Sequence, residues 1–163
     1  MSDLTSAAVP PLGPDDHVRG EGEELIVYAD LGCPHCAAAW ERISAVPARL
    51  VFRHLPMASK HPRSPVLHAA AEAAGSQGKF FEMVDSLFAD RGRVDDPHLW
   101  ERVERLGLDL ERFEADRRSD RVAARVQRDF ESGIRAGVTS TPALFRAGEE
   151  MTLGHLESLA TSD

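Results

Sequence analysis

The sequence is poor in lysine, in net positive charge and in long apolar stretches, and each shortage argues against a class of protein. Lysine occurs only at Lys60 and Lys79, so arginine supplies the rest of the 19 basic residues. With 27 acidic residues the formal net charge is −8, whereas nucleic-acid binders present basic surfaces. No stretch approaches the roughly 18 apolar residues that a membrane span requires. We therefore expect neither nucleic-acid binding nor a membrane span.

The N-terminal segment "MSDLTSAAVPPLGPDDHVRG" lacks the basic start and the apolar run of a secretory signal. This absence favours a cytoplasmic protein. Its prolines and glycines predict a flexible arm over residues 1–20. Residues 21–163 are then long enough to form a single domain whose core needs no disulfide or metal to hold it together.

Cysteine is also scarce, and the two that occur lie together at Cys33 and Cys36, in "YADLGCPHCAAAW". Two cysteines at this spacing form a redox pair, half of a zinc site, or a structural coincidence. A zinc site would need two further ligands, taken from His54, His61, His68 or an acid, and none of these has a recognisable zinc spacing. We therefore expect no metal and favour a redox pair.

The residues around the cysteines predict a strand, a tight turn and a helix. "ELIVYADL" from Glu24 is an apolar run of strand length, and Cys33-Pro34 opens a helix, because proline is favoured in a first turn. A sulfur at a helix start meets unpaired N–H groups and the positive end of the helix dipole, which favours thiolate. His35 can hydrogen-bond or charge-stabilise that thiolate. Cys36, one turn inside, suits the role of resolving thiol.

The rest of the chain predicts an α/β layout with a helical insertion between the second and third strands. The second strand is expected at about 49–55, the insertion at about 62–137, a hairpin at 143–146 and 150–153, and a short helix after it. We expect core positions for an apolar set of side chains and surface or capping positions for three histidines. The apolar set is Trp40, Phe80, Phe81, Met83, Leu87, Phe88 and Trp100, and the histidines are His54, His61 and His68.

Several motifs occur in an order that resembles the DsbA family of thiol-disulfide oxidoreductases, which have a thioredoxin-like fold. They are "CPHC" after an apolar strand, "FRHLPM", "AAAEAAGSQGKFFEMVDSLF", "LGLDLERFEAD" and "SGIRAGVTSTPALF". The likeness covers about residues 16–145. It implies that Cys33 is the attacking thiolate, that Cys36 is the resolving thiol, and that Pro34 and His35 set the redox potential.

The same resemblance implies a substrate-binding segment and a reaction. Thr141-Pro142 matches the segment that faces the dithiol, where the family has a cis proline and where an extended substrate can pair with the backbone. The implied activity is exchange of disulfides with protein or peptide thiols, with glutathione or another low-molecular-weight thiol as a further candidate partner. The Cys33–Cys36 disulfide is itself the redox group, so no other cofactor is expected.

The sequence departs from the DsbA family pattern at two places, and three functions other than disulfide exchange are alternatives. Val27 stands where the family commonly has a buried carboxylate that relays a proton to the resolving thiol, and the chain after Phe145 is shorter than usual. The rivals are a glutathione-dependent transferase or isomerase on the same fold, a non-catalytic peptide-binding or chaperone module, and a metal-binding module. Retention of both Cys33 and Cys36 counts against the first.

Overall fold

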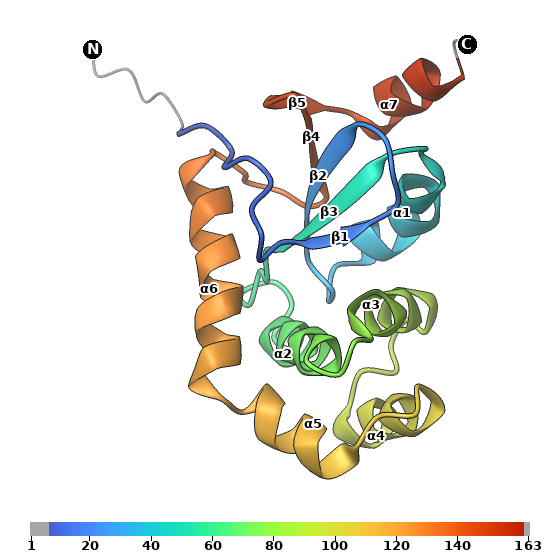
Figure 1. Cartoon of the computed structure of the whole chain (residues 1–163), viewed down its shortest axis with the longest axis vertical. Helices are drawn as coiled ribbons and strands as arrows, with labels where there is room; N and C mark the ends of the chain where they lie inside the picture. The colour runs from blue at the N-terminus through green and yellow to red at the C-terminus, as the bar shows by residue number, and fades with distance from the viewer. Residues whose placement is uncertain (1–6, 162–163) are drawn as a thin grey trace.

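The computed structural model describes residues 7–161, which form a five-stranded mixed sheet flanked by helices (Figure 1). The strands run in the order β1-β3-β2-β4-β5 across the sheet. Their bounds are β1 His17–Arg19, β2 Glu24–Ala29, β3 Arg49–His54, β4 Ala143–Arg146 and β5 Glu149–Met151. The helices are α1 Pro34–Ala45, α2 Ser64–Gly75, α3 Phe80–Ala89, α4 Asp96–Arg105, α5 Leu110–Arg117, α6 Asp120–Arg135 and α7 Leu153–Ala160.

Strand β2 lies at the centre of the sheet and is covered on both faces. It pairs in parallel with β3 and antiparallel with β4. Leu25, Val27 and Ala29 point into one core cluster, whereas Ile26 and Tyr28 point into a second cluster on the opposite face. The continuous apolar run of β2 follows from this burial, because successive side chains of a strand alternate between the two faces.

The helical insertion forms a second layer beside the sheet, and α2 is its innermost helix. Figure 1 shows α2 to α5 gathered at one end of the sheet, with α6 running from them along its side. Helix α2 contacts α3, α5 and α6, and its alanines at 70, 71, 73 and 74 are fully buried. Among residues 7–161, no helix is both long and apolar enough to cross a membrane.

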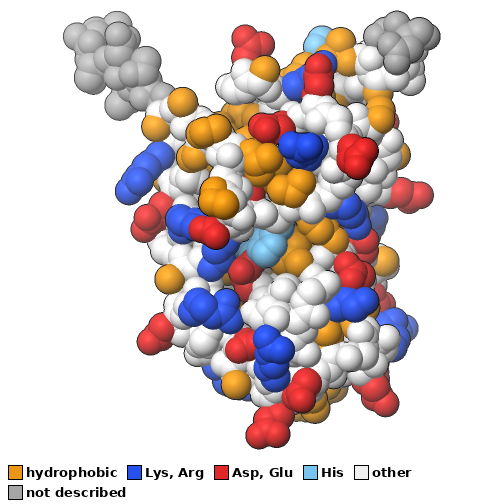
Figure 2. Space-filling view, viewed as in Figure 1, with side chains coloured by type: hydrophobic (Ala, Val, Ile, Leu, Met, Phe, Trp, Pro, Cys, Tyr) orange, Lys and Arg blue, Asp and Glu red, His pale blue; other side chains and the backbone are white. Residues whose placement is uncertain are grey.

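The layout predicted from the sequence is confirmed, with the insertion following the strand at 49–54. Strand β1 was not predicted, so the insertion lies between the third and fourth strands of the chain rather than the second and third. Figure 2 shows acidic and basic side chains interspersed over the helical part of this face.

The flexible arm predicted over residues 1–20 is corrected for its described part, residues 7–20. Strand β1 pairs antiparallel with β3, and Arg53 of β3, only 3% exposed, needs partners for its charge. Asp16 accepts two hydrogen bonds from the Arg53 guanidinium at 3.0 and 3.1 Å, and the Pro11 carbonyl accepts another at 3.1 Å. Burial of this arginine therefore holds the segment against the sheet. Residues 1–6 of the predicted arm lie outside the described residues.

Two further predictions about burial were wrong. His54 and His68 are completely buried rather than at the surface, because they satisfy each other's ring nitrogens across the β3–α2 interface. Trp100 is 41% exposed and donates its indole N–H to Glu114 at the surface. The core positions predicted for Trp40 and for the phenylalanines, methionine and leucine of α3 are confirmed.

Gly133 lets α6 approach the sheet closely. A Cβ at this position would lie 2.7 Å from Leu55 Cδ1 and 2.9 Å from Tyr28 Cδ1, which is closer than van der Waals contact allows. The Tyr28 ring is held in place, since its hydroxyl hydrogen-bonds Ser132 at 2.8 Å and accepts from Arg53 at 3.1 Å. The ring therefore has little freedom to move away.

We predict that Gly133→Ala lowers the free energy of unfolding by about 2 kcal/mol, because overpacking outweighs the gain in helix propensity. Gly154→Ala in α7 is the matched control, since a Cβ there meets no atom within 4 Å. Urea unfolding of both variants provides the measurement. Equal stability of the two variants would contradict the close approach of α6.

Candidate active site

The dithiol lies where β2 ends and α1 begins. Cys33 is the N-cap residue of α1, with Pro34 in the first turn, and its N–H donates to the Asp30 carbonyl at 3.0 Å to close the turn. Both cysteines are free thiols; Cys33 is 6% exposed and Cys36 1%. The strand, turn and helix predicted around the pair are confirmed.

The pKa values of the two thiols are shifted in opposite directions. The pKa of Cys33 is lowered from 9.0 to about 4, chiefly because the Cys36 side chain hydrogen-bonds its sulfur; burial opposes this shift, and the backbone N–H groups of Cys36 and His35 add to it. The pKa of Cys36 is raised far above its ordinary value, because it shares its proton with Cys33 and is buried. Near neutral pH the arrangement therefore holds a thiolate at Cys33 and a protonated thiol at Cys36.

The segment Thr141-Pro142 lies against this dithiol. Its peptide bond is cis, the geometry that the resemblance implies, and the Thr141 carbonyl oxygen lies 4.0 Å from Cys33 Sγ. Both residues are half-buried, while Pro34 and His35 are exposed. The structure thus brings all six sequence-predicted site residues together, with the His35 contribution coming from its backbone N–H rather than its ring.

Asp30 fixes the turn that carries Cys33. Its carboxylate is fully buried and accepts hydrogen bonds from Gly32 N–H at 2.9 Å, Ser64 Oγ at 2.5 Å and Met57 N–H at 3.1 Å. Burial raises the pKa of this carboxyl, but the neighbouring His68 ring and hydrogen bonds from Ser64 and Gly32 lower it by more, so the net shift is downward. The Asp30 backbone N–H also donates to Cys36 Sγ at 3.4 Å. Asp30 therefore contacts the turn, α2 and Cys36 at once.

A chain of buried hydrogen bonds continues from this turn through α2 to β1. Leu31 N–H donates to His68 Nε2 at 2.9 Å, so neutral His68 carries its proton on Nδ1. That proton points to His54 Nδ1 at 2.7 Å, and His54 then carries its own proton on Nε2, which donates to Glu72 at 2.8 Å. Glu72 also binds His17 at the edge of the sheet. One backbone N–H thus sets the tautomers of both buried histidines.

Burial and hydrogen-bond partners shift the pKa values of His68 and Glu72 in this network of buried hydrogen bonds. The pKa of His68 is lowered to about 4, first by burial and then by its position beside His54, although the nearby Asp30 carboxylate acts to raise it. Burial raises the pKa of Glu72, but hydrogen bonds from His17 and His54 bring it far below its ordinary range. Glu72 is therefore a buried carboxylate that its two histidine partners stabilise.

His17, His54 and Glu72 are also the one group of potential metal ligands that residues 7–161 bring together. A metal ion at His54 Nε2 would displace the proton donated to Glu72, and this proton has no other place because Nδ1 accepts from His68. The hydrogen bonds therefore favour a proton-bearing chain over a metal centre. The cysteines belong to no such group among the described residues.

Sequence reasoning missed this chain, although one signal was present. His68 and Glu72 are four residues apart in "VLHAAAEAAG", and so share one face of a helix in which alanine is the commonest residue. Two polar side chains on the buried stripe of such a helix indicate a buried polar network. The third member, His54, comes from β3, a contact that helical spacing alone does not reveal.

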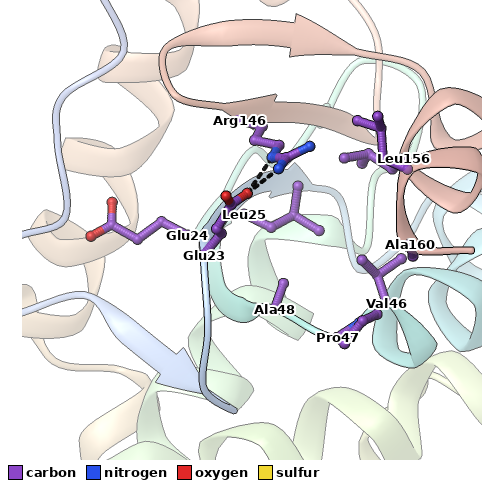
Figure 3. Close-up of a pocket in the computed structure, with 10 residues that line it drawn as sticks. Glu23, Glu24, Leu25, Val46, Pro47, Ala48, Arg146, Leu156 and Ala160 are labelled. Carbon is purple, nitrogen blue, oxygen red and sulfur yellow. Dashed lines mark hydrogen bonds and ion pairs between the residues drawn. The ribbon is translucent and has the colours of Figure 1, made fainter. Parts of the chain in front are cut away.

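Two cavities lie at opposite ends of β2. One, of about 530 Å³, opens beside Cys33 and is lined by Leu31, Gly32, Pro34 and the loops that flank α2 and α3. The other, of about 200 Å³, lies between the start of β2, the α1–β3 turn and α7, where Arg146 pairs with Glu23 (Figure 3). Only the first reaches the dithiol, so we assign the candidate site to it.

Comparisons with known proteins agree with this assignment of the fold. A family model described as "Thioredoxin" matches residues 14–160. The thioredoxin-like oxidoreductase from Silicibacter pomeroyi DSS-3 superposes with a TM-score of 0.79 at 22% identity over 90% of each chain. The thiol-disulfide exchange protein alpha-DsbA2 from Wolbachia pipientis superposes with a TM-score of 0.75 at 19% identity, over 97% of this chain and 87% of that one. The predicted thioredoxin-like fold is confirmed.

The chain also matches part of larger curated proteins. It is 37% identical over 160 residues to the Na(+)/H(+) antiporter NhaA of Herminiimonas arsenicoxydans, which is 92% of this chain and 25% of that protein. The match to NhaA 1 of Salinispora arenicola is 39% over 147 residues, 85% of this chain and 22% of that protein. The chain spans about a quarter of the length of these relatives, so their transport activity is not carried over to it.

We predict that Cys36→Ala raises the pKa of Cys33, because the largest stabilising contact of the thiolate is the hydrogen bond from Cys36. Cys36→Ser keeps a donor and should raise it less. In the parent chain, alkylation of Cys33 should be half-maximal near pH 4 and nearly constant from about pH 6 to 8, where a free thiol gains about tenfold per pH unit. The free energy of unfolding of the reduced protein follows the same titration. Because the pKa of Cys33 is lower in the folded state than in the unfolded state, the thiolate contributes its full stabilisation above the pKa of the unfolded state. This contribution is lost as the pH falls through the pKa of the folded state. Equal thiolate absorbance titrations for the parent and Cys36→Ala would refute this prediction.

We predict that Glu72→Leu lowers the free energy of unfolding by about 3 kcal/mol, because it leaves two histidine donors without an acceptor. Glu72→Gln retains a carbonyl oxygen and should cost less. Glu82→Leu, at an exposed position of α3, is the control and should change stability by less than about 0.5 kcal/mol. Urea unfolding near pH 7 ranks the three variants, and similar values for Leu at both positions would contradict the buried chain.

Proposed function

The chain belongs to the thioredoxin family, and from that premise we propose that it exchanges disulfides with protein or peptide thiols, with Cys33 as the attacking sulfur and Cys36 as the resolving one. The observation that carries the proposal is the placement of two free sulfurs at the N-terminus of α1, one beside an open cavity and the other behind it. A structural pair would need no opening to solvent at one sulfur.

The reaction begins with attack of the Cys33 thiolate on a substrate disulfide. A bond forms between Cys33 and one substrate sulfur, the substrate S–S bond breaks, and the other sulfur leaves as a thiolate. Cys36 then attacks Cys33 Sγ, which forms the Cys33–Cys36 disulfide and releases the second substrate sulfur. The dithiol loses two electrons, the substrate disulfide gains them, and the Cys36 proton goes to a departing thiolate. The same steps in reverse oxidise a substrate dithiol.

The surroundings of the dithiol support each step. The backbone N–H groups at the start of α1 stabilise a negative charge on Cys33. Thr141 and Pro142 are half-buried beside it, within reach of an extended substrate backbone, so we assign substrate binding to them. Val27 is buried in the same cluster as Cys36 and offers no proton acceptor. We therefore infer that the departing substrate thiolate, rather than a buried acid, takes the proton of Cys36.

The direction of exchange depends on the surroundings in which the chain works. A thiol of low pKa makes its disulfide more oxidising, because the reduced form is the stabilised one. In a reducing compartment the dithiol would be mostly reduced, and it would act as a reductase or isomerase or respond to oxidants.

We predict that Cys36→Ser traps a mixed disulfide with a peptide disulfide, because Cys33 still attacks but no thiol releases it. Cys33→Ser should form no adduct, and turnover by either variant should fall at least about tenfold. Mass spectrometry after acid quenching measures the adduct, and circular dichroism checks that both variants are folded. Full biological activity of the Cys33→Ser, Cys36→Ser double variant, despite loss of exchange turnover, would instead favour the non-catalytic binding module.

A further inference from the structure

The cavity beside Cys33 carries an unusual balance of charge for this molecule. The chain has 27 acidic and 19 basic residues, yet the cavity is lined by Lys60, His61, Arg63 and Arg91 and by no aspartate or glutamate. Lys60, His61 and Arg63 come from the loop between β3 and α2, and Arg91 comes from the loop between α3 and α4. Two loops that are distant in the sequence therefore place cations around one sulfur.

Two of these cations have no charge partner among residues 7–161. Arg63 donates to the Val94 carbonyl at 2.6 and 2.9 Å and to Asp96 at 2.9 Å, which fixes its position. The side chains of Lys60 and Arg91 are exposed and make no ion pair or hydrogen bond with any described residue. Elsewhere on the described surface most arginines pair with acids. Lys60 and Arg91 thus leave positive charge available to a ligand.

The floor of the cavity is apolar and continues along α1. Leu31, Leu67 and Leu87 line it beside Cys33, and a second cavity of about 550 Å³ adjoins it, since both are lined by Ala37 and Arg91. The second cavity contains Trp40 and also both signs of charge, because Arg19, Glu41 and Asp85 line it. Each cavity alone has the size of a small-molecule site. Together they form a groove that suits an extended chain.

We propose that this groove selects polypeptide substrates in which acidic residues flank the reacting cysteine and an apolar side chain lies next to it. The carboxylates contact Lys60 and Arg91, the apolar side chain packs on the leucines, and the substrate sulfur reaches Cys33. The inference rests on the proposed exchange activity and assigns its substrate class. The reaction is the balanced exchange described above, with the substrate disulfide as oxidant.

The effect of acidic residues on the rate of reaction distinguishes the local cations of this groove from the net charge of the whole protein. A net charge of −8 repels acidic peptides, so the overall field makes an acidic substrate slower than a neutral one. Local cations at the reacting sulfur make it faster, and both effects weaken as salt screens them. A preference for acidic peptides at low salt therefore points to the groove.

The experiment compares three cystine peptides of equal length, with glutamate, glutamine or lysine on both sides of the cysteine and one leucine beside it. We expect the reduced protein to react about tenfold faster with the glutamate peptide than with the glutamine peptide at low ionic strength. The lysine peptide should be slowest, and the ratio should approach one at high salt. Second-order rate constants come from acid quenching and mass spectrometry.

Matched variants assign the preference to the groove. Lys60→Gln with Arg91→Gln should bring the glutamate-to-glutamine ratio to one or below. Lys79→Gln with Arg128→Gln removes the same charge from residues that do not line either cavity, and should leave the ratio unchanged. Equal loss of preference in both double variants would overturn the groove as its origin.

The other possible results also test the inference and the exchange activity on which it rests. Equal rates for all three peptides would overturn the inference and leave the exchange activity standing, whereas no reaction with any peptide would overturn both. Glutathione disulfide, a small acidic disulfide, serves as a fourth substrate. If it reacts faster than the glutamate peptide and loses that advantage in Lys60→Gln with Arg91→Gln, the occupant is a small thiol and the polypeptide assignment is wrong.

Discussion

The site depends on one proton held between two sulfurs at the start of a helix. Because Cys36 keeps that proton and points it at Cys33, one sulfur is charged and reactive while the other is neutral and held in reserve. The N-terminus of α1 provides the stabilising N–H groups, and the buried strand β2 brings the helix to that position. The protonation state of each thiol therefore depends on the hydrogen bond that it makes with the other.

Beneath this pair, the fold uses buried polar groups where apolar packing would have been simpler. Asp30 anchors the turn, His68 and His54 pass hydrogen bonds across the interface between α2 and β3, and Glu72 ends the buried part of the chain. Such a network is costly unless every member is satisfied, and it then specifies a single arrangement. The turn that carries the reactive sulfur is thereby fixed relative to the sheet and to the helical layer.

Short-range patterns in the sequence were enough to predict where the dithiol lies. They could not predict its surroundings, which depend on contacts between residues that are distant in the sequence. The apolar run of β2 and Pro34 in the first turn of α1 each act within a few residues, so the strand, turn and helix around the dithiol could be predicted. Strand β1 has three residues and exists through pairing with β3, which no short-range pattern encodes. His54 and His68 were assigned to the surface because burial of a histidine depends on a partner from another element.

The pairing of β1 with β3 has a consequence for where this domain can be cut. Asp16 neutralises Arg53, and His17 binds Glu72 while its ring stacks on Phe80. A recombinant fragment starting at Glu21 would keep both cysteines and every described helix, but it would leave the buried Arg53 cation without its carboxylate partner and remove one of the two histidines that bind Glu72. The smallest unit that can be excised intact therefore begins upstream of Pro11, in a stretch whose composition looks like a dispensable tail.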